Sequence, residues 1–287
     1  MIFRGESLVE ILAWIARRRA AGEPIAFSVL DPDRGAGHHA GERIGDAVHR
    51  PLRVWLDLAE RLGLRLATPQ PHDGLIDLRF EPLARAKPTR GGDPTERYGA
   101  DSAFARIHKT EDPYFVLDLR EALARVGPRA TILDLGVNTG EELLLLPPAA
   151  ITGIDHSESA LAIARARFPA AQFLTADLNT TLPVGRFDLV ICLGTLQSGA
   201  LDDRALVRRV LQDHLAPGGA VIFGLPNCRY LDGEVEYGAR MVNFTQPELG
   251  LLVKDLAFYR KYLQQHAMQV FVTGKHEILV TGVPSSE

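Results

Sequence analysis

Two acids and two glycines between residues 131 and 155 have the types and spacing needed to bind a nucleoside-type cofactor. The apolar run Thr131–Leu135 predicts a strand with Asp134 near its end, and Gly136 and Gly140 flank the turn that follows. Because glycine has no Cβ, the backbone of such a turn can approach a ligand closely. Asp155 ends the next apolar run, nineteen residues after Gly136, where its carboxylate can accept from both hydroxyls of a ribose. The pattern predicts a strand, a turn, a helix and a second strand around a ribose-bearing cofactor.

The charge of the turn favours a cationic cofactor over a dinucleotide. Asp134, Glu141 and Glu142 surround it, while Asn138 and Thr139 lie within it, Asn138 standing where a dinucleotide-binding turn has its middle glycine. Like charges at close range cost about 1 kcal/mol or more even in fairly polar surroundings, so three carboxylates would repel a pyrophosphate. S-adenosylmethionine has no phosphate and carries a sulfonium and an ammonium. We therefore expect it to be the cofactor.

Over about residues 98–284 the sequence resembles the class I S-adenosylmethionine-dependent methyltransferases. The acid-x-Gly-x-x-x-Gly turn and the acid after the second strand are two marks of that family. A third is Asp177 with Leu178 at the end of an expected strand over 172–178, and a fourth is the L-x-P-G-G turn before the strand Ala220–Gly224. The resemblance implies an α/β fold with a class I methyltransferase-like sheet that ends in an antiparallel hairpin, here over 269–283.

The resemblance also implies roles for individual residues. Asp177 should accept from the adenine amino group, and Leu178 should pack on the adenine ring. The fourth strand, expected over 187–194, should bring Leu193 to the methionine end of the cofactor. Family members often carry a basic or aromatic residue upstream that reaches the cofactor carboxylate, and the candidates are Tyr98, Arg106 and Lys109. Two alternatives stay open. The two basic residues can instead form surface ion pairs with the acids at 111 and 112, and an aspartate at a strand end often only caps the next helix.

The composition indicates a globular chain and gives no sign of a polyanionic partner for the chain as a whole. The 287 residues are 46% hydrophobic and carry a net charge of −4, and no run approaches the roughly 20 uncharged apolar residues of a membrane span. The N-terminal helix pattern places its arginines after the apolar part, which is the reverse of a secretory signal. Only Cys192 and Cys228 are present, without metal-ligand spacing, and Cys192 follows an apolar run that should bury it. We expect a soluble, cytoplasmic protein that holds no metal.

The chain divides near a stretch rich in proline and glycine. Residues 1–83 are expected to form a small α/β module for substrate recognition or oligomerisation, and 84–97 a linker. Residues 98–287 are expected to form the cofactor-binding domain, with an insertion at 225–266. In the module, Trp55 lies on an apolar helix stripe and is expected to be a core residue. The sequence leaves open whether the chain forms a homodimer.

The acceptor of the methyl group is the least determined part of this interpretation. The Asn/Asp-Pro-Pro-Tyr signature of amino methylation and the Pro-Cys nucleophile of cytosine-C5 methylation are both absent. Positioning supplies most of the rate in such transfers, so a general base is not obligatory and no catalytic residue is assigned. Asn227 and Tyr230, which follow the fifth strand, are the candidate acceptor contacts. A small-molecule acceptor is favoured, with an RNA or protein acceptor, or a silent cofactor-binding module, as alternatives.

Overall fold

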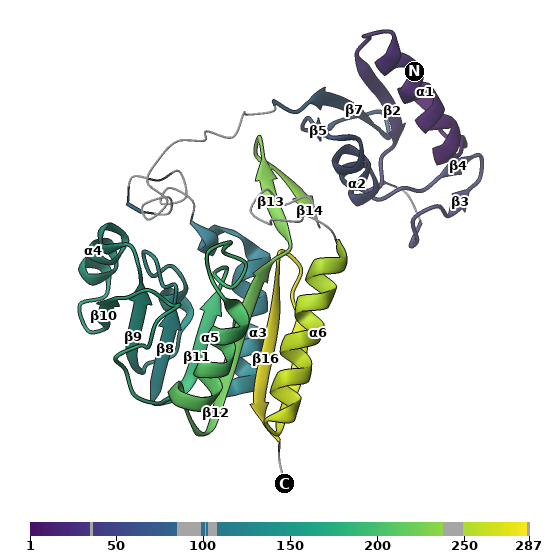
Figure 1. Ribbon diagram of the computed structural model, residues 1–287. Helices are drawn as coiled ribbons and strands as arrows, with labels where there is room; N and C mark the ends of the chain where they lie inside the picture. Colours follow the sequence, from purple (N-terminus) through teal and green to yellow (C-terminus); the bar gives the residue numbers. More distant parts are fainter. Residues whose placement is uncertain (35–36, 85–98, 101, 103–107, 238–248, 286–287) are drawn as a thin grey trace. The chain divides into compact units, whose positions relative to one another are not determined.

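The computed structural model describes residues 1–287 except 35–36, 85–98, 101, 103–107, 238–248 and 286–287. The chain forms two compact units (Figure 1). Unit 1 comprises residues 1–88 and 230–236, and unit 2 comprises residues 89–229 and 237–287. Most of the expected linker at 84–97, and Tyr98 and Arg106, lie outside the described residues.

Unit 1 is a sheet with two helices. Its strands run in the order β1-β2-β7-β5, and β6 also pairs with β7. Ser7 and Glu10 form a capping box at the start of the first helix, and Gly63 ends the second in the left-handed conformation. Trp55 is fully buried, as expected, and its ring lies 5.6 Å from that of Phe27. The elements are β1 (Ile2–Phe3), α1 (Leu8–Ala20), β2 (Ile25–Leu30), β3 (Arg43–Ile44), β4 (Ala47–Val48), α2 (Leu52–Leu62), β5 (Leu64–Leu66), β6 (Gln70–His72) and β7 (Leu75–Pro82).

Unit 2 contains the expected sheet, in the strand order β10-β9-β8-β11-β12-β16-β15. The first five strands are parallel, and β16 runs antiparallel to both β12 and β15. A class I methyltransferase-like sheet with a terminal antiparallel hairpin is therefore confirmed. The elements are η3 (Lys109–Glu111), α3 (Pro113–Val126), β8 (Thr131–Leu135), η4 (Glu142–Leu145), β9 (Ala150–Asp155), α4 (Glu158–Arg167), β10 (Gln172–Thr175), β11 (Phe187–Leu193), α5 (Asp203–Arg209), η5 (Val210–His214), β12 (Leu215–Pro226), α6 (Leu249–Gln265), β15 (Met268–Thr273) and β16 (Glu277–Pro284). Two further strands, β13 (Cys228–Leu231) and β14 (Glu234–Tyr237), pair with each other, and each has residues assigned to both units.

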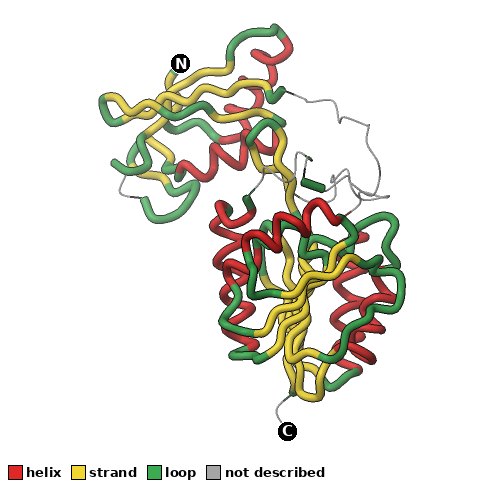
Figure 2. Tube along the Cα trace, turned by 90° about the vertical axis from the view of Figure 1, so that its left-hand side faces the viewer, coloured by secondary structure: helices red, strands yellow, loops and turns green. Residues whose placement is uncertain are grey.

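Helices cover both faces of this sheet (Figure 2). Alternate residues of the central strands point to opposite faces, so the core divides into two layers. One layer packs Ile132, Ile191 and Ile222 against α3. The other packs the neighbouring strand residues, such as Leu133 and Val190, against α5 and α6.

The segment after the glycine turn differs from the expected helix. It forms only the single 3₁₀ turn η4, because Pro147 and Pro148 follow within a few residues and proline cannot continue a helix. The fifth strand is longer than expected, since it begins at Leu215 rather than Ala220, and the third ends at Thr175. In the described residues, no helix is long and apolar enough to cross a membrane.

Candidate functional site

The turn after β8 has the backbone conformation that its residue types predict. Gly136 and Gly140 have φ of 81° and 77°, and Asn138 has φ of 49°. Asparagine is one of the few non-glycine residues common in this left-handed region, which explains how it replaces the middle glycine of a dinucleotide turn. A Cβ on Gly136 would lie 2.1 Å from Oγ1 of Thr195, so only glycine fits there.

Asp155 lies at the end of β9 and holds this turn in place. Its Oδ2 accepts from the backbone N–H of Asn138 at 2.9 Å, and its Oδ1 accepts from that of Ser157 at 2.9 Å. The residue is 5% exposed. Nδ1 of His156 also lies 3.3 Å from Oδ1. A carboxylate has about four acceptor positions, so acceptor capacity stays available to a ribose hydroxyl. Asp155 therefore serves the turn whether or not it also binds a ribose.

Asp134 is fully buried at the end of β8, and neither carboxylate oxygen has a hydrogen-bond partner among the described residues. Burial, reinforced by the neighbouring charge of Glu142, raises the pKa of Asp134 well above its usual range, against the opposing effect of Lys109. Burial likewise raises the pKa of Glu142 to about 7, again against Lys109. A buried carboxylate without a partner is costly, so this end of the sheet favours an added cation or hydrogen-bond donor.

Lys109 brings one positive charge to the same place. Burial alone would lower its pKa, but the surrounding carboxylates, Glu277 first and then Glu142 and Asp134, raise it. A Cβ on Gly194 would lie 3.1 Å from Nζ of Lys109 and 3.7 Å from Oε1 of Glu277. Both side chains therefore lie at the tip of β11, where the family resemblance puts the methionine end of the cofactor.

Glu141, the third acid of the turn, is held by other partners. Its carboxylate lies 2.7 Å from Nη1 of Arg167 and 3.1 Å from Nδ1 of His108, and it accepts from the hydroxyl of Thr110 at 3.1 Å. Thr139 adjoins this group, since its carbonyl accepts from Arg167. Glu141 therefore ties the turn to the segment before α3, which distinguishes it from Asp134 and Glu142.

The residues proposed for the adenine and methionine ends differ in exposure. Asp177 is exposed, and its Oδ1 accepts from the backbone N–H of Asn179 at 2.9 Å, so it forms a local turn. Leu178 is 8% exposed and Leu193 2%, and both pack in the core clusters of the sheet. Cys192 is fully buried, and burial raises the pKa of its thiol well above the usual range, which excludes a reactive thiolate.

The two candidate acceptor contacts fall in different units. Asn227, in unit 2, uses its side-chain amide to donate to the carbonyl of Lys275 at 2.9 Å, and its backbone N–H donates to the carbonyl of His276. Tyr230, in unit 1, is 53% exposed. Asn227 thus has a structural role in closing the end of β12, and an acceptor role for either residue stays a prediction.

Sequence reasoning missed Glu277. It lies at the first position of β16, and its Oε1 has no hydrogen-bond partner among the residues described. A Cβ on Gly224 would lie 2.3 Å from that oxygen, so glycine in β12 makes room for it. No local signal marks this residue, because its place at the site depends on the pairing of β12 with β16.

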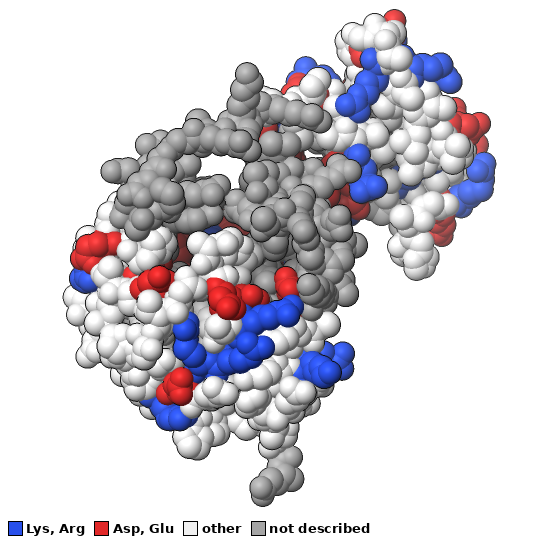
Figure 3. Space-filling model, in the orientation of Figure 1, with Lys and Arg blue, Asp and Glu red and all other residues white. Residues whose placement is uncertain are grey.

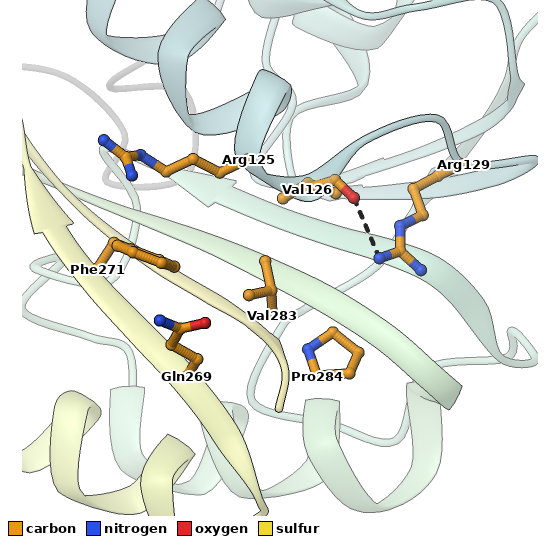
Figure 4. Close-up of a pocket in the computed structure, with 7 residues that line it drawn as sticks. All are labelled: Arg125, Val126, Arg129, Gln269, Phe271, Val283 and Pro284. Carbon is orange, nitrogen blue, oxygen red and sulfur yellow. Dashed lines mark hydrogen bonds between the residues drawn. The ribbon is translucent and has the colours of Figure 1, made fainter. Parts of the chain in front are cut away.

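A cavity of about 510 Å³ lies at the opposite end of the sheet from the glycine turn (Figure 4). Its walls come from the end of α3, the start of β15 and the end of β16, and Arg129 donates to the carbonyl of Val126 across one side. Parallel sheets of this kind bind ligands at the carboxyl ends of their strands. The cavity is therefore not the cofactor site.

The residues at the carboxyl edge fit S-adenosylmethionine. Asp134 supplies a buried carboxylate that an ammonium would satisfy, and Gly136 keeps the backbone accessible where a side chain would collide with Thr195. Asp155 retains acceptor positions for a ribose. The fold and this edge together define the class I methyltransferase type of domain.

Comparison with known proteins agrees with this class. Residues 132–219 match the family model described as a methyltransferase domain, so this part of the chain is a class I S-adenosylmethionine-dependent methyltransferase domain. Trans-aconitate 2-methyltransferase of Variovorax paradoxus (strain S110) is 37% identical over 117 residues, which is 38% of this chain and 44% of that enzyme. The same enzyme of Escherichia coli (strain K12 / DH10B) is 40% identical over 83 residues, 27% of this chain and 33% of the relative. The match thus spans less than half of each relative.

Solved structures of similar fold include proteins in complex with S-adenosylhomocysteine. The DhpI complex is 23% identical, with a TM-score of 0.47, and covers 67% of this chain and 96% of that one. The plantazolicin methyltransferase BpumL is 14% identical, with a TM-score of 0.49, and covers 67% of this chain and 94% of that one.

Proposed function

We propose that this chain is an S-adenosylmethionine-dependent methyltransferase that transfers a methyl group to an oxygen, nitrogen or sulfur nucleophile of a small molecule. The observation that carries the proposal is the buried carboxylate of Asp134, which has no hydrogen-bond partner among the described residues and lies beside the Gly136–Gly140 turn, inside a domain that matches the methyltransferase family. An acidic site of this kind suits a cofactor that carries an ammonium and a sulfonium.

Each part of the cofactor has a proposed partner. Asp134 would face the ammonium, Lys109 the carboxylate, and Asp155 the ribose hydroxyls, while Asp177 and Leu178 would hold the adenine. When bound, S-adenosylmethionine supplies an electrophilic methyl group on its sulfonium. The chain's own contribution is to fix the position of that methyl group and to exclude water from it, which in well-oriented reactions is worth roughly 7 to 11 kcal/mol.

Two observations support a small-molecule acceptor over RNA. The relatives named above are named for methylation of trans-aconitate, a small molecule. Figure 3 shows basic side chains gathered over the α5 region of unit 2, with acidic side chains beside them. The basic groups there have partners within the unit: Arg209 donates to the carbonyl of Asn179 at 2.8 Å, and the guanidinium of Arg204 lies 4.6 Å from the ring centre of Phe258. These contacts account for the charges without a polyanion.

Transfer of a radioactive methyl group tests the proposal directly. Protein is incubated with tritiated S-adenosylmethionine and fractionated cell extract, with trans-aconitate as a defined acceptor in a parallel sample. We expect the label to enter the small-molecule pool. Label in RNA or protein would change the acceptor class, and cofactor binding without any transfer would indicate a silent binding module.

We also propose that unit 1 recognises the acceptor or mediates a homodimer, and that the protein works in the cytoplasm. Sedimentation velocity separates the two roles of unit 1. A monomer at all concentrations favours recognition, and a dimer favours assembly.

The acidic turn should select the cofactor by charge. We expect S-adenosylmethionine and S-adenosylhomocysteine to raise the melting temperature, because a ligand that binds the folded state stabilises it by RT ln(1 + [L]/Kd). NAD and NADP should leave it unchanged, because their pyrophosphate would meet the acids of the turn. Thermal-shift measurements check this, and stabilisation by NAD alone would reverse the choice of cofactor.

Substitutions at the candidate acceptor contacts should affect transfer more than cofactor binding. For Asn227→Ala we expect lower methyl transfer and unchanged affinity for S-adenosylmethionine, and for Tyr230→Phe a smaller loss of the same kind. Calorimetry and the labelling assay measure the two quantities. If both variants bind and transfer like the wild type, the acceptor contacts lie elsewhere.

A further inference from the structure

A hydrogen-bonded chain of three side chains lies in unit 2 beside the proposed methionine end. The carboxylate Oδ2 of Asp112 lies 2.5 Å from Nδ1 of His276, and Nε2 of His276 lies 2.8 Å from the hydroxyl of Tyr237. The side chains of Asp112 and His276 are 13% and 11% exposed. An acid, an imidazole and a hydroxyl in this order can move a proton from the hydroxyl to the imidazole.

The backbone brings this chain of residues to the edge where the methyl group would be. Asp112 follows Lys109 at the end of η3, and His276 immediately precedes Glu277. Lys109 and Glu277 both lie at the tip of β11, as the spacing around Gly194 shows. Asp112 and His276 are therefore anchored next to Glu277 and Lys109, and Lys109 is the residue proposed for the cofactor carboxylate.

The surroundings of His276 hold it in one orientation. Its ring lies 4.5 Å from the ring of Tyr114 and 5.5 Å from that of Tyr237. The ammonium of Lys275 lies 4.6 Å from the centre of the Tyr114 ring and 5.3 Å from that of Tyr237. The carboxylate of Asp112 fixes Nδ1 as the protonated nitrogen, which leaves Nε2 to accept from the phenol.

We propose that Asp112, His276 and Tyr237 form a proton relay for the methyl transfer, and that the acceptor is protic, with a hydroxyl or amine as its nucleophile. The inference rests on the proposed methyltransferase function. A carboxylate acceptor is already ionised near neutral pH and needs no base, whereas a hydroxyl or amine must lose a proton.

The proposed methyl transfer conserves protons and electrons. The acceptor gives its proton to the phenolic oxygen of Tyr237 as the phenol's own proton passes to Nε2 of His276. The freed lone pair of the acceptor bonds the methyl carbon, and the electrons of the carbon–sulfur bond stay on sulfur. Asp112 stabilises the resulting imidazolium, which then releases its proton to water.

The chain offers conservative variants that separate this role from packing. Tyr237→Phe keeps the ring beside His276 and removes only the hydroxyl. Asp112→Asn removes the charge but keeps an acceptor for the N–H of Tyr114, which Asp112 caps at the start of α3. Tyr114→Phe is the matched control, because Tyr114 touches His276 but is not in the proton path.

Labelling of the small-molecule fraction with tritiated S-adenosylmethionine measures the relay, with calorimetry for cofactor affinity. We expect His276→Gln and Tyr237→Phe to lower kcat about 100-fold or more, the usual range for loss of acid–base catalysis. We expect Asp112→Asn to lower kcat by a smaller factor, Tyr114→Phe to leave it unchanged, and all four to bind the cofactor normally. Wild-type kcat in His276→Gln and Tyr237→Phe, with cofactor bound, would overturn the relay and leave the proposed function standing.

Nitrogen NMR of the histidine ring gives a second readout that needs no turnover. We expect His276 to carry its proton on Nδ1 in the wild type, and the Nε2 resonance to shift in Tyr237→Phe but not in Tyr114→Phe. A proton on Nε2, or an Nε2 resonance unmoved by loss of the phenol, overturns the relay by itself. If the wild-type protein neither binds S-adenosylmethionine nor transfers label, the proposed function fails separately, and the protic-acceptor inference falls with it.

Discussion

Asp155→Ala is expected to weaken binding of S-adenosylmethionine by about 1.5 to 3 kcal/mol, or roughly 10- to 150-fold in Kd, which is the range for hydrogen bonds to a charged group. The variant should also lose stability, because the backbone N–H groups of Asn138 and Ser157 both donate to this carboxylate. A buried donor left without its acceptor costs about 1 to 3 kcal/mol. Calorimetry measures the first effect and urea denaturation the second.

Asp155→Asn separates the two effects. The amide keeps one acceptor oxygen for a backbone donor, so this variant should regain part of the stability that alanine loses. It should still bind the cofactor less tightly than the wild type, because a neutral amide accepts more weakly from a ribose than a carboxylate does. A folded Asp155→Ala protein with unchanged affinity would mean that Asp155 only supports the turn.

The local signals around the glycine turn predicted the central part of unit 2 well. The apolar run of β8 is recovered with its bounds, and that of β11 to within one residue at its end, because a buried parallel strand needs an uninterrupted hydrophobic segment. The positions of Gly136 and Gly140 predicted a tight turn, and both adopt positive φ. These features depend on short stretches of chain, which a sequence displays directly.

The expected helix after the turn was wrong for a reason visible in the sequence. Glycine turns of this type usually lead into a helix, but Pro147 and Pro148 follow Gly140 within two helical turns. The structure shows that the local stop signal prevailed.

The acidic side of the site could be predicted only in part. Asp134 and Glu142 belong to the turn itself, but their burial follows from what packs over them. Glu277 and His276 reach the site because β16 pairs with β12, and Asp112 meets His276 across 164 positions of the chain. A contact over such a separation leaves no periodic or compositional mark, so the structure was needed to find it.

The buried acid Glu142 should make the stability of the protein fall as pH rises through neutrality. Burial raises its pKa from 4.5 to about 7, so the folded state holds a proton that the unfolded state releases. A group with a raised folded pKa contributes stability that is complete below pH 4.5 and is lost as pH rises through about 7. This loss amounts to roughly 2 to 3 kcal/mol of unfolding free energy between pH 5 and pH 8. Glu142→Gln, which cannot ionise, should match the wild type near pH 5 and be more stable by about that amount near pH 8.

Glu141→Gln is the matched control, because Glu141 is the next residue and its pKa is shifted the other way. Burial opposes this shift, but the hydrogen bonds of Arg167, His108 and Thr110 lower the pKa of Glu141. Its contribution to stability is therefore present above the unfolded pKa and lost only in more acidic solution. Urea denaturation across pH 5 to 8 should give Glu141→Gln a curve parallel to the wild type and Glu142→Gln a flatter one. If the Glu142→Gln curve also runs parallel to that of the wild type, Glu142 is ionised throughout this pH range. The attraction of Lys109 would then outweigh burial in setting the pKa of Glu142.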